Sequence, residues 1–169
     1  MIVESELLEL ARQRESAVES ALAGMLLDPP HFLRREYRAY LARLLDRNRI
    51  RGPVEAIQQL NRVQGGFEEL VCPELSFSSG ARLEFNVRLE QEQGGWLVRR
   101  FHFCLDLPQQ RRINRVRIEL NPEGSHNPLE VPRCHMHIDN SQAHIPFPVM
   151  NPRLILHVIC DQIEPDVGS

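Results

Sequence analysis

The sequence predicts an α+β fold: an N-terminal helical segment, an antiparallel β-meander of about four to five strands, and a C-terminal helix packed on the sheet. Two changes in the spacing of apolar residues along the chain support this class. Apolar residues recur at three-to-four-residue spacing up to residue 62, alternate with polar residues from residue 82, and return to helical spacing after residue 152. We therefore expect a helical head in residues 1–65 and the sheet with its covering helix in residues 66–169 of the 169-residue chain.

Three helices are expected in the head. The first apolar stripe runs from Leu7 to Met25 and is ended by Pro29-Pro30, because the residue before a proline disfavours helical geometry. The second stripe runs from Leu33 to Leu45, and a short third stripe runs from Val54 to Leu60. Gly65-Gly66 closes this part of the chain.

Period-two alternation then predicts four strands. They cover Arg82–Leu89, Leu97–Leu107 with Arg99 as an exception, Arg115–Leu120 and Arg133–Ile138. The short connections between them favour antiparallel pairing of neighbours. Their polar rows consequently share one face of the sheet.

The closing helix begins at a recognisable cap. Asn151 is a favourable N-cap residue, and Pro152 suits the first helical position. The apolar side from Leu154 to Ile163 is expected to pack on the apolar face of the sheet.

The shared polar face is the candidate site. It collects Arg88, Arg100, His102, Arg115, Arg117, Arg133, His135 and His137, with Glu84 and Glu119 among them. Arginines hold phosphates through two parallel hydrogen bonds, and imidazoles exchange protons near neutral pH. We therefore expect a face that cleaves RNA without a metal or other cofactor. The alternative is a solvated face with cross-strand Arg–Glu pairs.

The expected roles differ by residue type. His135 and His137 would exchange protons with a ribose hydroxyl and a leaving oxygen, and the substrate would be held by Arg100, Arg115, Arg117 and Arg133.

A zinc site is the other interpretation of the His-x-His run. Residues i and i+2 of a strand point the same way, so His135 and His137 could reach one ion. His126, Asp139 or His144 could complete the ligand set.

Composition limits the function classes. The net charge of −3 and the pI near 6.2 argue against a general nucleic-acid coat, although all 20 basic residues are arginine. No stretch is long and apolar enough for a membrane span, and the first residues lead us to expect no secretory signal. The four cysteines form no CxxC pair. We expect a cytoplasmic protein with buried free thiols.

The C-terminal hundred residues resemble the TumE-type toxins of bacterial toxin–antitoxin modules. A two-strand meander and the strand Arg115–Asn121 are followed by the His-x-His run, the segment His144–Pro148 and a helix ending in Asp161–Glu164. The resemblance covers Arg82 to Glu164 and implies a bacterial toxin that acts on RNA or translation and pairs with an antitoxin. His135 and His137 are the residues that match the family's motif.

A non-catalytic alternative remains open. The amphipathic head would then dock a protein partner, or a second copy of the chain, as a subunit of a defence or regulatory complex.

Overall fold

The computed structural model describes residues 4–62, 66–109, 112–124 and 129–166. Its centre is a seven-stranded antiparallel sheet in which the strands lie in chain order, so the expected meander is confirmed but has more strands than predicted. The strands are β1 (Gln58–Arg62), β2 (Phe67–Ser76), β3 (Arg82–Glu92), β4 (Gly95–Asp106), β5 (Arg115–Leu120), β6 (Cys134–Ile138) and β7 (Ile145–Pro146).

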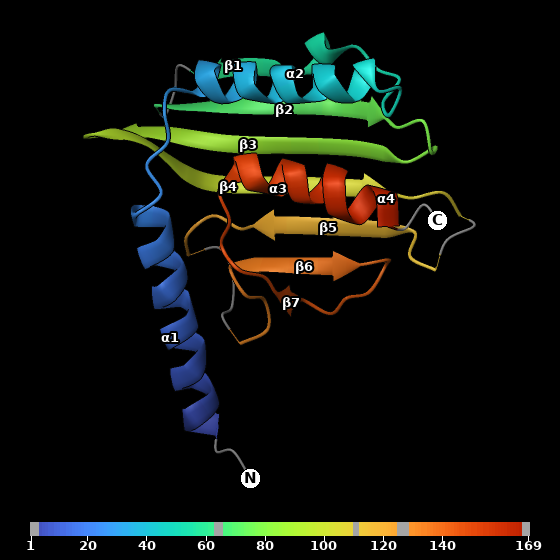
Figure 1. Ribbon diagram of the computed structural model, residues 1–169. Coiled ribbons are helices and arrows are strands. Elements are labelled where there is room, and N and C mark those ends of the chain that lie inside the picture. Colours follow the sequence, from blue (N-terminus) through green and yellow to red (C-terminus); the bar gives the residue numbers. More distant parts are fainter. Residues whose placement is uncertain (1–3, 63–65, 110–111, 125–128, 167–169) are drawn as a thin grey trace.

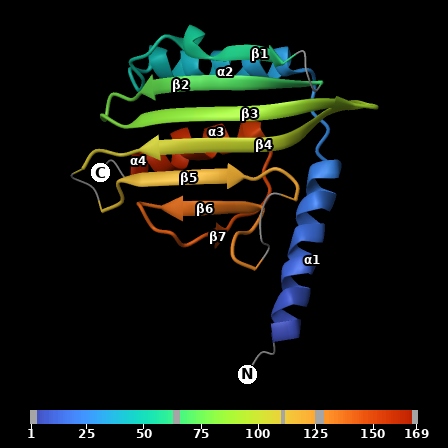
Figure 2. The same ribbon diagram turned by 180° about the vertical axis from the view of Figure 1, so that it is seen from behind.

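Helices cover one face of this sheet (Figure 1). They are α2 (Pro30–Asp46) and a C-terminal helix made of α3 (Pro152–His157), a π-helical turn (Val158–Ile163) and α4 (Glu164–Asp166). Seen from behind, the strands lie in front of these helices, and the second face of the sheet carries no described helix (Figure 2). The remaining helix, α1 (Glu4–Ala23), runs along one end of the strands and past the β7 edge in both views.

The core lies between the covering helices and the apolar face of the sheet. One cluster of buried side chains joins Leu41 of α2, Phe85 of β3, Phe103 of β4 and Ile155 of α3. Full burial of a large apolar side chain is worth about 1.5–3 kcal/mol. The helical part and the sheet therefore stabilise each other through a common core.

Residues 54–62 do not form the third helix that the sequence predicts. Val54–Ala56 is a short 3-10 turn, and β1 follows and pairs with β2 from Gln58↔Val71 to Arg62↔Phe67. An apolar pattern of only seven residues fits a helix and a strand almost equally well. Pairing with β2 satisfies the backbone groups of this segment, and that tertiary contact decides the outcome.

Arg99, the exception in the alternation, marks a β-bulge. The register between β3 and β4 passes from Arg88↔Arg100 to Leu89↔Val98, so no residue of β3 lies opposite Arg99 in the backbone pairing. The bulge exchanges the two faces, so Val98 is buried where the sequence pattern pointed to Leu97.

The C-terminal helix begins as predicted and is held on the core by polar contacts. The Asn151 side chain accepts a hydrogen bond from the Arg153 N–H at 3.0 Å, and the Tyr37 hydroxyl donates to the Pro152 carbonyl at 2.7 Å. Arg49 donates to Glu164 at 2.7 Å and to the Cys160 carbonyl, in the π-helical turn, at 2.6 Å. Arg49 thus fixes the far end of this helix.

The state of the cysteines and the character of the helices bear on two expectations drawn from composition. Cys72, Cys104, Cys134 and Cys160 are all free and buried, as predicted. Among the described residues, no helix has the length and apolar character needed to cross a bilayer.

We predict that Arg49→Ala lowers the free energy of unfolding by about 1–3 kcal/mol, because it leaves the carboxylate of Glu164, 5% exposed, without its cation. The matched control is Arg51→Ala, which removes a hydrogen bond to the Ser78 carbonyl from an exposed side chain and should cost less than about 0.5 kcal/mol. Urea titration measures both. Equal losses would show that the Arg49–Glu164 contact does not hold the helix.

Candidate functional site

The register of the central strands brings five polar side chains together on the face of the sheet that carries no described helix, which we call the open face. Glu119 of β5 lies opposite His102 of β4 on one side and opposite His135 of β6 on the other. Two residues further along each strand, Arg117 lies opposite His137. Because side chains alternate along a strand, these residues point to the same face.

A further imidazole, that of His144, lies against His135 and His137. His144 precedes β7 and lies with its ring centroid 4.9 Å from that of His135 and 4.5 Å from that of His137. The centroids of His135 and His137 are themselves 4.9 Å apart. One ring nitrogen from each of the three residues lies within 4.8 Å of the other two. We call His135, His137, His144 and Glu119 the imidazole cluster.

Glu119 connects the cluster to β4. Its Oε1 accepts a hydrogen bond from Nδ1 of His102 at 2.8 Å, and its Oε2 lies 3.1 Å from Nε2 of His135 and 3.5 Å from Nε2 of His137. The hydrogen bonds from His102 and His135 hold the pKa of Glu119 far below its usual range and outweigh the opposing effect of burial. Glu119 is therefore ionised at every physiological pH.

Backbone carbonyls fix the orientation of the two predicted histidines. Nδ1 of His135 lies 2.7 Å from the Pro132 carbonyl oxygen, and Nδ1 of His137 lies 3.3 Å from that of Ser141. A carbonyl oxygen only accepts, so Nδ1 carries the proton in both rings. Their side chains are 2% and 6% exposed. Both Nε2 atoms consequently face Glu119.

The surroundings drive the histidines toward different charge states. Burial, followed by Arg117, lowers the pKa of His137, and burial, followed by His135, lowers the pKa of His144. Hydrogen bonds with Cys104 and Glu119 raise the pKa of His102 to about 9. A charged imidazole thus lies beside neutral ones, an arrangement that separates a proton donor from a proton acceptor.

Two of the four predicted phosphate-binding arginines remain beside the cluster. Arg117 neighbours His137, and its charge acts on His137, His144 and Glu119. Arg100 lines a pocket of about 160 Å³ together with His102 and Glu119. An anion in this pocket would meet the guanidinium of Arg100 and the charged ring of His102.

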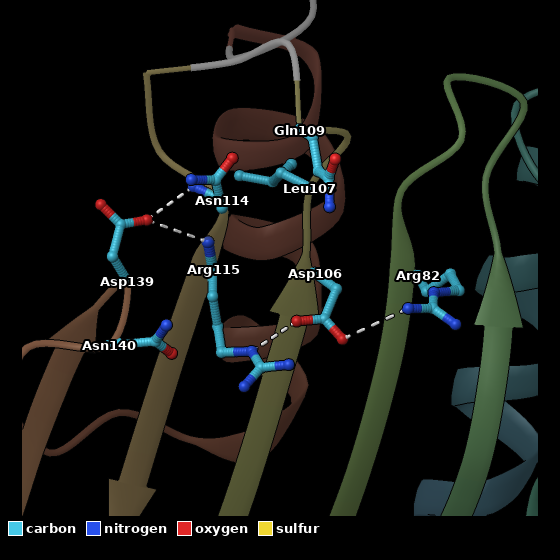
Figure 3. Close-up of a pocket in the computed structure, with 8 residues that line it drawn as sticks. All are labelled: Arg82, Asp106, Leu107, Gln109, Asn114, Arg115, Asp139 and Asn140. Carbon is cyan, nitrogen blue, oxygen red and sulfur yellow. Dashed lines mark hydrogen bonds and ion pairs between the residues drawn. The ribbon is translucent and has the colours of Figure 1, made fainter.

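Arg115 lies elsewhere, in a pocket of about 270 Å³ at the ends of the strands (Figure 3). Its Nε donates to Asp106 at 2.5 Å, so its charge is already paired. In the same pocket Asp139 accepts the backbone N–H groups of Asn114 at 2.6 Å and Arg115 at 3.3 Å. Asp139, a candidate zinc ligand, thus holds the start of β5 and takes no part in the cluster.

Arg133 also does not join the cluster. Its side chain is 1% exposed, forms an ion pair with Glu19 of α1, and donates from Nε to the Asn121 carbonyl at 3.1 Å. Arg133 therefore anchors α1 against the sheet. His126, another candidate zinc ligand, lies outside the described residues.

Sequence reasoning placed Glu119 and His102 on the polar face without giving them a role. The order of the predicted strands could have indicated a role for Glu119, because a meander sets the strand of Glu119 between those of His102 and His135. The contribution of His144 had no such signal, because it depends on the path of the loop before β7.

We predict that the contacts of His102 with Cys104 and Glu119 make stability depend on pH in a defined window. His102 has a folded pKa of about 9 against an ordinary value of 6.5, so its contribution is complete below pH 6.5 and is lost as the pH rises through 9. The melting temperature of the wild type should fall relative to that of His102→Gln across this window. Parallel curves for the wild type and His102→Gln would contradict the assignment.

The chain was compared with known protein families, curated proteins and solved structures. No protein-family model, no curated protein and no solved structure gives a significant match to the chain. The likeness to TumE-type toxins stays a prediction.

Proposed function

We propose that the protein is a toxin-like enzyme that cleaves RNA at the imidazole cluster, in the bacterial cytoplasm and under the control of an antitoxin. The observation that carries the proposal is the convergence of neutral imidazoles, a charged imidazole and two arginines around Glu119 on the open face of the sheet. A phosphodiester needs cations around its oxygens, a proton acceptor for the attacking hydroxyl and a proton donor for the leaving oxygen. All three kinds of group are present.

The groups can be given roles in an internal transesterification. His137, whose pKa is lowered, accepts the proton of a ribose 2′-hydroxyl through its Nε2 lone pair. The 2′-oxygen bonds to phosphorus, the bond from phosphorus to the 5′-oxygen breaks, and the charged ring of His102 protonates that oxygen. The products are a 2′,3′-cyclic phosphate and a 5′-hydroxyl.

The other members position these groups. Glu119 and the Pro132 carbonyl fix His135, and Glu119 also holds the ring of His102. Arg100 and Arg117 flank the cluster and would bind the phosphate oxygens.

We predict that purified protein cleaves total bacterial RNA in the presence of EDTA and that His135→Ala/His137→Ala reduces the rate at least about 100-fold, the size of a lost acid–base contribution. His137→Gln alone should give a similar loss, and it guards against misfolding of the double variant, because both rings are buried. Circular dichroism checks the fold of each variant.

The matched control for the arginines is the pair Arg100→Ala and Arg115→Ala. Arg100 faces the pocket beside His102, whereas Arg115 is paired with Asp106, so only the first variant should raise the KM for RNA.

Cleavage by the double histidine variant at the wild-type rate would exclude the cluster as the catalytic centre.

A second function is favoured by one observation on α1. Leu7 and Leu10 are 47% and 56% exposed on a helix that extends past the sheet. In this alternative the protein is a non-catalytic subunit whose α1 docks a protein partner, an antitoxin or a second copy of the chain.

The docking alternative predicts that Leu7→Glu/Leu10→Glu dissociates the complex that forms in the host, as measured by size-exclusion chromatography with light scattering. Leu154→Glu is the matched control, because Leu154 is 51% exposed but lies on α3. A complex of unchanged mass with the α1 variant would exclude α1 as the docking element.

A further inference from the structure

We infer that His135, His137 and His144, with the Glu119 carboxylate, form a binding site for one divalent transition-metal ion of the zinc type. The inference goes beyond the proposed RNA cleavage, because an ion can bind here whether or not RNA is the substrate. It rests on the hydrogen-bonding pattern of the rings, on the distances between their nitrogens and the carboxylate, and on the charge balance of the cluster.

The hydrogen-bonding pattern leaves a place for a cation. His135 and His137 each have a carbonyl oxygen at Nδ1 and the same Glu119 oxygen at Nε2. Both partners of each ring are acceptors, so an Nε2 lone pair that faces Oε2 is repelled by the carboxylate, and a cation between the two atoms removes this repulsion. Protons on both would create two adjacent imidazolium rings that repel each other. One divalent ion satisfies both nitrogens and the carboxylate together.

The distances fit a tetrahedral ion. Ligand atoms about 2.0–2.1 Å from a tetrahedral zinc lie roughly 3.3 Å from one another. The distances from Glu119 Oε2 to Nε2 of His135 and His137 are 3.1 Å and 3.5 Å. Two edges of the required tetrahedron are therefore already present.

His144 supplies the remaining nitrogen. Its ligand atom lies within 4.8 Å of those of His135 and His137, so an approach on the order of 1 Å reaches the distance a zinc site requires. His144 lies in the segment leading into β7 and is only half-buried, so its ring has room for this movement.

The composition of the cluster suits a divalent cation. Glu119 supplies one negative charge. The carbonyls at Nδ1 of His135 and His137 are the outer-shell acceptors that orient metal-bound imidazoles in proteins. Imidazole nitrogens with one carboxylate suit zinc and its neighbours among the transition metals.

A second group of candidate ligands on the same face is weaker. Glu84, His102 and Cys104 also lie within 4.8 Å of one another. Nδ1 of His102, however, is engaged by Glu119, and Glu84 is exposed. Cys104 therefore provides a control that separates the two groups.

Metal binding has a consequence for cleavage that rests on the proposed function. The ion occupies the Nε2 lone pair with which His137 would accept the proton of the 2′-hydroxyl. Zinc should therefore slow RNA cleavage, and EDTA should restore it.

The test measures binding directly, on the full chain freed of metal with a chelator. Zinc is titrated against a chromophoric chelator, and cobalt(II) is added separately to record its visible absorption. We expect one equivalent of zinc, a tetrahedral cobalt spectrum and a rise in melting temperature with zinc concentration. His144→Ala should weaken zinc binding at least about tenfold, the effect of removing even an outer-shell partner.

Glu119→Gln, which keeps the shape of the side chain, should also weaken binding, whereas Cys104→Ser and His157→Ala should bind as the wild type does. Three results would overturn the inference. They are less than half an equivalent of zinc on the wild type, unchanged zinc binding by both His144→Ala and Glu119→Gln, and loss of zinc binding in Cys104→Ser. Zinc binding without RNA cleavage would refute the proposed function alone, and cleavage without zinc binding would refute the metal site alone.

Discussion

The carboxylate of Glu119 is the element on which the open face depends. One oxygen accepts the hydrogen bond from His102, and the other faces Nε2 of both His135 and His137. A half-buried carboxylate in hydrogen-bonding contact with His102 and His135 stays ionised because both contacts favour its charge. The same charge favours the protonated form of His102, while burial favours the neutral forms of His137 and His144. Without Glu119 the histidines would be three separate side chains on a sheet.

The meander is what makes this arrangement possible. Pairing β4, β5 and β6 in chain order sets Glu119 between His102 and His135 by register. The apolar faces of the same strands pack on α2 and α3, so each strand is fixed by the core on one side while it presents polar groups on the other. Arg133, buried against Glu19, fixes α1 beside the start of β6. The scaffold is therefore rigid where the cluster needs precise distances.

Much of this could be predicted from the sequence, and the failures have physical causes. Alternation identified β3 to β6, and the Asn151-Pro152 pair identified the last helix, because both signals are local. The bulge at Arg99 and the pairing of β1 depend on a neighbouring strand, which a pattern along one segment does not contain. The same limit applied to the site. Periodicity placed Arg133 on the polar face, but contact with α1 decides what its side chain does, and His144 reaches the cluster only through the fold of a loop.

Both proposals depend on a neutral His137 whose Nε2 lone pair is directed at an ionised Glu119, and RNA cleavage also depends on a charged His102. Long-range ¹H–¹⁵N spectra of the histidine rings, recorded on metal-free protein between pH 5 and 10, test this most directly. The account predicts that at pH 7.5 His137 is neutral with its proton on Nδ1 and that His102 is still an imidazolium, titrating near 9. A proton on Nε2 of neutral His137, or titration of both rings together near 6.5, would contradict it.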